Sequence, residues 1–379
     1  LNIIDVMKIT YLFVTGRKSR IENIDTYAKE MFYGYDYFAS KYQDTKIIEL
    51  HDRKQFSNKL YFFIDRVINK LTVLPFNMNN VTSKENLNII FRSDHLIISN
   101  DRLAFSSLPM ILLSKIMRKK VKVTFFAMGL FSERKRNIVQ KILSKQLLKI
   151  IFKYTENVVF LGKIEYEIAN KKFSRYKQKF HFVPFAVDYD FWKIDKEYEN
   201  IKKEHILFVG NDTNREFEKI VQIASILKDK KFTFVSKHFR IKNIKVDLDN
   251  VRIIDGSWGN QKISDEELKK LYRDSKLVLI PLKESNQPSG QSVTLQSMSC
   301  GTPVMITKTK GFWDPVSYSH LENIYFVENN TVDNWVRAIN ELLDDDSLLN
   351  KISNNGLRTI ESRYTLNDFN KKIEKIIKT

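Results

Sequence analysis

The chain has 379 residues, 43% of them hydrophobic, which is enough apolar material for two ordinary domains and excludes a largely disordered chain. The single cysteine, Cys300, excludes an internal disulfide framework and a multi-cysteine metal site, and we expect it to be a small buried hydrophobe. The formal charge is +18, but residues 1–186 hold 33 Lys and Arg against 16 Asp and Glu, whereas residues 187–379 hold 30 against 29. The first half therefore favours a polyanionic partner.

Apolar runs alternate with helical patterns along the first half, which predicts a parallel α/β sheet. The predicted strands are residues 8–14, 46–50, 95–99, 121–126, 157–161 and 180–183. Helices fit between the strands, for example at 105–118 and 134–153. We therefore expect an N-terminal doubly wound domain over residues 1–186.

The second half repeats this alternation after the segment 187–203, which is rich in charged and aromatic residues and is the predicted linker. The predicted strands are residues 205–210, 232–236, 251–254, 277–282, 304–307 and 324–327. The predicted helices are residues 216–228, 332–343, 347–362 and 366–378. This pattern indicates a second doubly wound domain over residues 204–362, followed by a C-terminal helix within 363–379.

The segment from Pro288 to Val304 is a polar, glycine-containing loop that opens a short helix between two apolar strands. Ser289 and Ser292 are candidate caps of that helix, Gly290 lets the backbone approach a ligand, and Gly301 ends the helix. The free N–H groups at such a helix start favour an anion, and a diphosphate would suit them.

The predicted helix 134–153 has two faces. One carries an apolar stripe and the other a lysine row: Val139, Leu143, Leu147 and Ile151 against Lys141, Lys145, Lys149 and Lys153. The stripes are offset by two residues, roughly 200° around the helix, so they lie on opposite sides. The pattern predicts a helix packed on the core with a basic outer face, which is either solvated or in contact with anionic lipid headgroups.

No apolar run reaches 18 residues, so the sequence predicts no membrane-spanning segment. The first strand begins near Met7, and residues 1–6 are interpreted as an upstream extension.

Four segments taken together resemble one known family. They are Met298 with Cys300 to Val304, Val183 to Asp188 with Phe191, Phe208 to Asp212 with Arg215, and Asp255–Gly256 followed by Leu268 to Pro281. The chain is similar in these segments to the nucleotide-sugar-dependent glycosyltransferases of the GT-B fold, particularly the large retaining family of glycosyl transferases group 1. The resemblance implies two Rossmann-like doubly wound α/β domains facing across a cleft. It also allows the C-terminal helix to return to the first domain.

In that family the first domain binds the acceptor and the second binds the nucleotide-sugar donor. Carried over residue by residue, the resemblance gives the donor-binding candidates Gly210, Asn211, Asp212, Arg215, Lys237, Asp255, Gly256, Ser289, Gly290, Gln291, Ser292, Val293 and Gln296. Two glutamates of the family pattern fall on Pro288 and Gln296 here. An amide at Gln296 still hydrogen-bonds ribose hydroxyls, but Pro288 cannot replace the carboxylate beside the transferred sugar. The histidine that these enzymes often carry after a first-domain strand is replaced within Ala127–Met128–Gly129.

The catalytic candidates follow from the chemistry of sugar transfer. Charge builds on the leaving diphosphate, so Arg215 and Lys237 are the candidate cations. If the sugar carbon is inverted, a general base is required, with Asp101 the first choice and Asp94 the second. The alternative role of both aspartates is to cap a helix or turn. If configuration is retained, the family's usual scheme requires no such base.

A metal role is disfavoured. Asp188 and Asp190 fall in the predicted linker, Asp247 and Asp249 in a loop, and the six histidines show no paired ligand spacing. The expectation is a metal-independent enzyme with no cofactor besides the nucleotide sugar, which is most simply UDP- or GDP-linked.

The leading functional hypothesis is a hexosyltransferase that builds a bacterial cell-surface polysaccharide, such as lipopolysaccharide, or a lipid-linked glycan. We expect a cytoplasmic, peripheral protein held at the inner face of the cytoplasmic membrane by its basic first domain. Two alternatives remain open. One is a sugar-nucleotide epimerase of the same fold, and the other is a basic nucleic-acid-binding protein, which the lack of a recognition motif disfavours.

Overall fold

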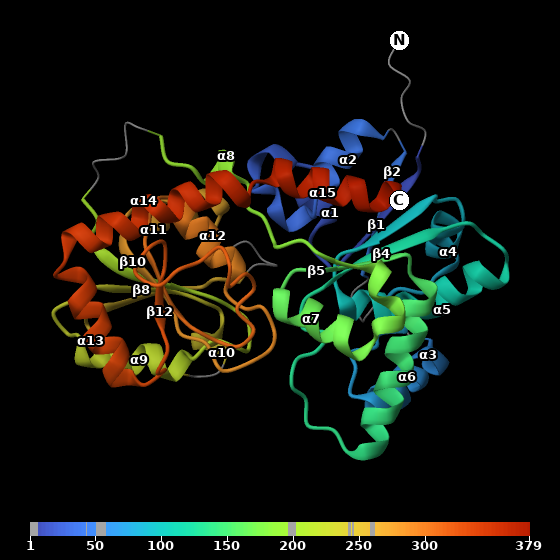
Figure 1. Cartoon of the computed structure of the whole chain (residues 1–379), viewed down its shortest axis with the longest axis horizontal. Coiled ribbons are helices and arrows are strands. Elements are labelled where there is room, and N and C mark those ends of the chain that lie inside the picture. The colour runs from blue at the N-terminus through green and yellow to red at the C-terminus, as the bar shows by residue number, and fades with distance from the viewer. Residues whose placement is uncertain are drawn as a thin grey trace, which may run out of the picture. The chain divides into compact units, whose positions relative to one another are not determined.

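The structure is a computed structural model that describes residues 7–42, 44–50, 58–195, 202–241, 244, 246–257 and 262–379. The chain forms two compact units, whose elements are labelled in Figure 1. Unit 1 comprises Leu1–Val183 together with Asn370–Thr379, and unit 2 comprises Pro184–Phe369. In the described residues, no helix combines the length and the apolar character needed to cross a bilayer.

Unit 1 contains a six-stranded sheet in the order β2-β1-β3-β4-β5-β6, and its strand pairs are parallel. The strands are β1 Ile9–Phe13, β2 Thr45–Glu49, β3 His95–Ile98, β4 Lys122–Ala127, β5 Asn157–Phe160 and β6 Phe180–Phe182. Strand order reverses between β1 and β3, where the connections leave toward opposite faces of the sheet. In open α/β sheets, ligands bind at such a switch point, beyond the carboxyl ends of the strands.

Unit 2 contains a second six-stranded parallel sheet, in the order β12-β11-β10-β7-β8-β9. The strands are β7 His205–Val209, β8 Phe232–Val235, β9 Val251–Ile254, β10 Ser275–Ile280, β11 Val304–Thr307 and β12 Tyr325–Val327. Numbered from its own first strand, the order is 3-2-1-4-5-6, the dinucleotide-binding topology, and its switch point lies between β7 and β10.

Helices connect the strands of both sheets. Those of unit 1 are α1 Lys18–Ile21, α2 Tyr35–Lys41, α3 Lys59–Thr72, α4 Lys84–Phe91, α5 Asp101–Ile116, α6 Ile138–Tyr154 and α7 Lys163–Lys172, with 3₁₀ turns η1 Ile24–Thr26, η2 Lys29–Phe32, η3 Met78–Asn80 and η4 Ser174–Lys179. Those of unit 2 are α8 Tyr189–Trp192, α9 Phe217–Ile226, α10 His238–Ile241, α11 Asp265–Arg273, α12 Gln291–Ser299, α13 Val332–Leu343 and α14 Asp346–Arg363, and α15 is Leu366–Lys378.

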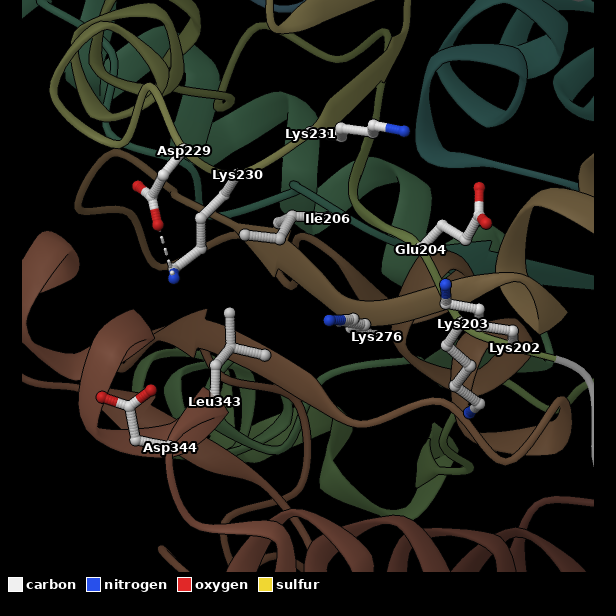
Figure 2. A pocket seen from close by; sticks show the side chains of 10 residues that line it. All are labelled: Lys202, Lys203, Glu204, Ile206, Asp229, Lys230, Lys231, Lys276, Leu343 and Asp344. Carbon is white, nitrogen blue, oxygen red and sulfur yellow. Dashed lines mark hydrogen bonds and ion pairs between the residues drawn. The ribbon is translucent and has the colours of Figure 1, made fainter.

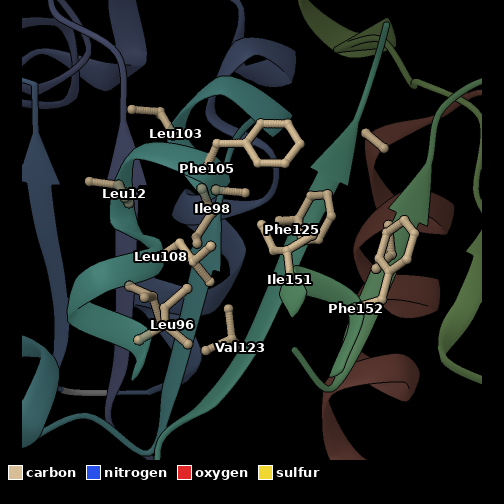
Figure 3. Packing of buried hydrophobic residues seen from close by; sticks show 14 of the residues in the cluster. Leu12, Leu96, Ile98, Leu103, Phe105, Leu108, Val123, Phe125, Ile151 and Phe152 are labelled. Atoms are coloured by element: carbon tan, nitrogen blue, oxygen red, sulfur yellow. The ribbon is translucent and has the colours of Figure 1, made fainter. Parts of the chain in front are cut away.

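The core of unit 1 is built from the inward side chains of the central strands and the helices that cover them. Figure 3 shows Leu96 and Ile98 of β3 packed with Phe125 of β4 and with Phe105 and Leu108 of α5. These side chains are buried almost completely. Strands buried on both faces read as continuous apolar runs, and most of the predicted strands lie within one or two residues of the observed ends for this reason. The edge strand β9 and the strand β2 are less buried.

The last ten residues belong to unit 1. Glu374 of α15 accepts a hydrogen bond from the Tyr42 hydroxyl at 2.9 Å and pairs with Lys41 at 2.7 Å. The Asn157 amide donates to the carbonyl of Ile376 at 3.2 Å. The C-terminal helix therefore ends against the helix α2 and the strand β5 of unit 1, the return that the resemblance allowed.

Two helix predictions for unit 1 need correction. Helix α5 begins at Asp101 and not at residue 105, because the Asn100 side chain caps it by accepting from the Leu103 N–H at 2.9 Å. Helix α6 begins at Ile138 and not at residue 134, because Asn137 and Gln140 form a capping box.

The predicted inner face of α6 is also partly wrong. Its buried side chains are Ser144, Leu148, Ile151 and Phe152. Val139, assigned to the apolar stripe, is 59% exposed, because the first turn of the helix lies outside the part that packs on the core.

The described start of the predicted linker packs within unit 2. Trp192 of α8 is 1% exposed, and its ring lies 5.7 Å from that of Tyr272. The Cys300 thiol donates to the Trp192 carbonyl at 3.2 Å, and burial raises the pKa of that thiol. Cys300 is therefore buried and protonated near neutral pH, as expected of a structural cysteine.

Candidate functional site

The loops that follow β7 and β10 meet at the switch point of unit 2. The Lys283 N–H donates to the Asn214 carbonyl at 2.8 Å, and the Asn214 amide donates to Ser289 Oγ at 2.7 Å. Two residues further along, the Glu216 N–H donates to the Pro281 carbonyl at 3.0 Å. These bonds fix residues 210–216 against residues 281–290, so the two loops form one surface beyond the carboxyl ends of the strands.

Asn211 ties the neighbouring strand ends to that surface. Its amide donates to the Gly256 carbonyl at 2.7 Å, and its Oδ1 accepts from the Lys237 N–H at 2.9 Å. The ring of His238 lies 2.7 Å from the Asn211 carbonyl oxygen. One side chain therefore holds the ends of β7, β8 and β9 together, which gathers the donor-binding candidates Gly210, Asn211, Asp212, Arg215, Lys237, Asp255 and Gly256 at one edge of the sheet.

Arg215 is buried beneath the turn that follows β7. Its Nε donates to the Val209 carbonyl at 3.3 Å, and its Nη1 lies 3.2 Å from Asp212 Oδ2. The Arg215 side chain is 3% exposed, whereas that of Asp212 is 43% exposed. The Nη1 contact is an ion pair without hydrogen-bond geometry, so one donor of the guanidinium is electrostatically paired but not hydrogen-bonded. An incoming anion would compete with Asp212 for this cation.

Gly210 is required by the path of that arginine. A Cβ at residue 210 would lie 2.3 Å from Arg215 Nε and 2.9 Å from its Cγ and Cδ. Because these atoms belong to the middle of a buried side chain, they cannot move aside without displacing the guanidinium. Gly210 thus places Arg215 directly under the turn.

Helix α12 presents its N-terminus to the same edge. Its N-cap is Gly290, with φ of 86°, a residue that has no side chain to cap the first turn. The prediction that Ser289 and Ser292 cap this helix is wrong, because Ser289 Oγ accepts from Asn214 and Ser292 lies inside the first turn. A Cβ at residue 290 would meet Ile306 Cδ1 at 3.1 Å. The positive end of the helix dipole is therefore left to a ligand.

Gln291, Val293 and Gln296 lie on α12 itself. Each is less than 9% exposed, and Gln296 Oε1 accepts a hydrogen bond from the Tyr272 hydroxyl at 3.1 Å. The amide that replaces a family glutamate is thus anchored to α11.

The remaining donor-binding candidates are more open. Lys237 is half-buried, and its ammonium forms no hydrogen bond or ion pair with the residues that the structure describes. Asp255 accepts from the Ser257 N–H at 2.9 Å and pairs with Arg240 at 3.2 Å. The hydrogen bond from the Ser257 hydroxyl, more than the other contacts, lowers the pKa of Asp255. Its carboxylate is therefore charged at neutral pH.

The loop before α12 is held by a close backbone approach. The Gly311 N–H donates to the Ser285 carbonyl at 2.8 Å, and a Cβ at residue 311 would lie 2.5 Å from backbone atoms of Ser285 and Asn286. We expect Gly311→Ala to lower the free energy of unfolding by about 1–3 kcal/mol, because the backbone of Ser285 and Asn286 must move to make room for the added methyl group. Chemical denaturation measures this loss. The control is Ser319→Ala, a change at an exposed residue that lies, like Gly311, between β11 and β12. An unchanged midpoint for Gly311→Ala would contradict the close approach.

In unit 1, Asp101 lies at the switch point after β3. It is the first residue of α5 and is 7% exposed. Burial raises the pKa of Asp101 to about 6, although Arg134 and a hydrogen bond from the Met128 backbone oppose the rise. A carboxyl group with a pKa near neutrality is suited to take up a proton.

Glu165 is a second buried carboxyl group beside Asp101, and the sequence analysis missed it. Its two oxygens accept from the N–H groups of Gly129 and Phe131, both at 2.8 Å. Burial raises the pKa of Glu165 to about 7, and the charge of Asp101 contributes. A glutamate on the inward face of α7, four residues before the buried Ala169, was the signal available in the sequence.

Glu165 makes stability depend on pH. Because its pKa is raised in the folded protein above the ordinary value of 4.5, its contribution is fully present below pH 4.5 and is lost as pH rises through about 7. We therefore expect the melting temperature of the wild type, relative to Glu165→Gln, to fall between pH 5 and pH 8. Differential scanning calorimetry across this range measures the difference, and a difference that does not vary with pH would contradict the burial of a titrating carboxyl group.

Asp94, the second candidate base, lies away from the switch point of unit 1. It precedes β3, so it lies at the amino end of the strand whose carboxyl end leads to Asp101. Its Oδ2 accepts from the Lys8 N–H at 2.8 Å, and its carbonyl accepts from the Lys122 N–H at 2.9 Å. Asp94 therefore joins the starts of three strands on the edge opposite the switch point.

A hollow of about 370 Å³ lies at the amino edge of the unit 2 sheet. Figure 2 shows the Lys276 side chain directed toward it, beside Ile206 and Leu343, and the Lys230–Asp229 ion pair of 3.1 Å at its rim. Five lysines and three acidic residues, Glu204, Asp229 and Asp344, line it. The lysines at this edge lie far from the carboxyl ends of the strands and are partly neutralised. Among the residues that the structure describes, no group of three or more His, Cys, Asp or Glu could hold a metal ion.

Two six-stranded parallel sheets, each with a switch point in its strand order, define a two-domain α/β protein of the GT-B class. Residues 193–359 match the family described as glycosyl transferases group 1. The chain therefore carries a group 1 glycosyl transferase domain, and the resemblance seen in the sequence is confirmed over that segment.

Solved structures show the same fold over the whole chain. Sucrose-phosphate synthase from Thermosynechococcus elongatus matches with a TM-score of 0.68 at 13% identity, covering 98% of each chain. HepE from Anabaena in complex with UDP matches with a TM-score of 0.61 at 11% identity, covering 98% of this chain and 100% of its own. A glycosyltransferase from Rickettsia africae gives 0.61 at 15% identity, covering 97% of each chain. No curated protein matches the sequence significantly.

Proposed function

We propose that the protein is a glycosyltransferase of the hexosyltransferase type, which moves a sugar from a nucleotide-sugar donor to a glycan or a lipid-linked acceptor. The observation that carries the proposal is the site at the switch point of unit 2. There Gly210 and the buried Arg215 lie beside the α12 N-terminus, whose N-cap Gly290 has no capping side chain. A cation and a helix dipole at one edge stabilise the charge that develops on a leaving diphosphate.

The donor is proposed to be UDP- or GDP-linked. HepE has been solved with UDP and with UDP-glucose, which supports a nucleoside-diphosphate sugar as the donor. Arg215, Lys237 and the α12 dipole supply positive charge to the diphosphate, so we propose no metal and no further cofactor. Asn211, Gly256 and Gln296 are proposed to contact the nucleoside part.

Unit 1 is proposed to bind the acceptor. If the sugar carbon is inverted, Asp101 would take the acceptor proton, and Glu165 would position the 128–131 loop beside it. If configuration is retained, neither carboxyl group is required as a base.

We propose that the product is a bacterial cell-surface polysaccharide, such as lipopolysaccharide, or a lipid-linked glycan. The protein would then act in the cytoplasm, at the inner face of the cytoplasmic membrane. The uneven charge supports this location, because residues 1–186 have 33 basic against 16 acidic side chains. Nucleic acid is not proposed as a partner.

The test is a mass-spectrometric assay of UDP-, GDP-, CMP- and dTDP-sugars with and without a bacterial lipid extract as acceptor. We expect one donor class to release its nucleotide when the extract is present and a glycosylated lipid to form. Conversion of a donor into its epimer without any acceptor would instead indicate a sugar-nucleotide epimerase. No reaction, together with no nucleotide binding, would contradict the proposal.

A further inference from the structure

Exposed apolar side chains are concentrated on two helices of unit 1. In the described part of the chain, fifteen large hydrophobic side chains are exposed, and nine of them lie on α3 and α6. They are Leu60, Phe62, Phe63, Val67, Leu71, Ile138, Val139, Ile142 and Ile150. Isolated exposed apolar residues are ordinary, but such a cluster marks an interaction surface.

The outer face of α3 alternates basic and apolar side chains. Phe62 and Phe63 are 61% and 63% exposed, and Lys59 and Arg66 lie one turn to either side of them. The only acid of the helix, Asp65, points inward and accepts from the N–H groups of Met78 and Asn79 at 2.7 and 3.1 Å. The outward face therefore carries positive charge and apolar area with no compensating carboxylate.

Helix α6 extends the same surface. It contains four lysines and no acidic residue. Ile138 is 76% exposed, and its neighbour Val139 is 59% exposed. The two helices pack side by side (Figure 1), and the Gln140 amide donates to the Lys70 carbonyl at 3.0 Å. This bond brings the exposed start of α6 to the exposed end of α3.

We propose that this α3–α6 surface is the part of the protein that enters an anionic phospholipid bilayer, with its aromatic and aliphatic side chains below the headgroups and its lysines among them. A purely solvated basic face would not expose two adjacent phenylalanines. A second copy of the chain would place lysine against lysine, because neither outer face offers an acid. Apolar insertion combined with attraction to anionic lipids is the mode of helices that lie in the membrane interface.

A hollow of about 630 Å³ adjoins the surface along α3. The residues that line it are Lys59, Phe62, Asp65, Arg66, Asn69, Asn77, Asn79 and Asn80. The Asp65 carboxylate accepts from the N–H groups of Met78 and Asn79. Two cations and one acid therefore line the hollow, and its net positive charge beside the Phe62 ring suits the phosphate and the first acyl carbons of one lipid. The hollow thus fits a headgroup held at the edge of the inserted surface.

The inference specifies the membrane association within the proposed function, and it is independent of the transfer reaction. The test is flotation of the full-length protein with vesicles of phosphatidylcholine alone or of phosphatidylcholine with 30% phosphatidylglycerol. Two variants, Phe62→Ser/Phe63→Ser and Ile138→Ser/Val139→Ser, are compared with Ile116→Ser/Met117→Ser, which removes exposed apolar residues at the end of α5. Circular dichroism melts confirm folding of each variant.

We expect the wild type to float only with phosphatidylglycerol vesicles. The partition coefficient should fall at least about tenfold in each α3 or α6 variant, since one buried aromatic or aliphatic side chain is worth that much, and should stay unchanged in the α5 control. Equal vesicle binding by all three variants would overturn the inference, and so would a wild type that does not bind anionic vesicles. It would also be overturned if the wild type sediments as a dimer that the Phe62→Ser/Phe63→Ser change dissociates. UDP binding measured on the same samples reports separately on the proposed function.

Discussion

Arg215→Ala is expected to weaken the binding of UDP by about 10- to 100-fold, the usual range for the loss of charge-assisted hydrogen bonds to a phosphate. The guanidinium is the buried cation beneath the turn after β7, and a diphosphate would replace its contact with Asp212. Isothermal titration calorimetry with UDP measures the change. Because the Asp212 carboxylate then remains without its cation, it adds repulsion to the loss of attraction.

Two further variants separate this effect from charge and from folding. Arg252→Ala removes an exposed cation from β9 and should leave UDP affinity unchanged. Arg215→Lys keeps the charge and should give an intermediate affinity, because lysine cannot reproduce the Nε bond to the Val209 carbonyl. Full UDP affinity in a folded Arg215→Ala variant would exclude the arginine from the donor site.

Asp101→Asn is expected to lower kcat of an inverting transfer by about 10²- to 10⁴-fold with little change in donor binding, which is the range for removal of a general base. The amide keeps the size of the side chain but cannot accept a proton. With burial raising the pKa of Asp101 to about 6, kcat of the wild type should fall as pH drops below that value. The pH profile of sugar transfer, with UDP affinity as the control, measures both effects.

The same variant distinguishes the two stereochemical courses. If Asp101→Asn transfers sugar at the wild-type rate and with the wild-type pH profile, Asp101 only begins helix α5. The product would then be expected to retain the anomeric configuration of the donor, which nuclear magnetic resonance of the product determines directly.

The positions of the strands along the chain could be predicted from the sequence, because a buried parallel strand is a continuous apolar run. The run at 277–282 is apolar on both faces, and the structure places β10 there, shifted by two residues. The pairing of the strands had no local signal. The switch points, and with them the gathering of residues 210–216 and 281–290, depend on long-range order in the sheet.

The sequence did not predict every detail of the site, because the same residue type can serve in more than one structural role. Ser289 and Ser292 are good N-cap residues, but the N-cap of α12 is Gly290, whose backbone has a φ of 86° and where a Cβ would crowd Ile306. Asp94 precedes β3 and Asp101 follows it, so only Asp101 lies at the carboxyl end of the strand, where ligands bind in such sheets. Glu165 was missed because a single glutamate on a short helix is usually solvated.

The exposure of α6 shows the same limit. The stripe that ends at Ile151 predicted a core-facing helix over its whole length, and Ile151 is indeed buried. The first turn instead lies beside α3, where Val139 is exposed. Periodicity gives the face of a helix, but not how far along its length the core extends.

Hydrogen exchange of the protein with and without saturating UDP tests the central claim, that a nucleoside diphosphate binds at the switch point of unit 2. We expect UDP to slow amide exchange in the segments 210–216, 236–238 and 288–293, with the largest change at the first turn of α12. The lysine-lined hollow at the amino edge, around residues 202–206 and 229–231, should exchange at unchanged rates. Protection of that hollow instead, with no change at 288–293, would contradict the account.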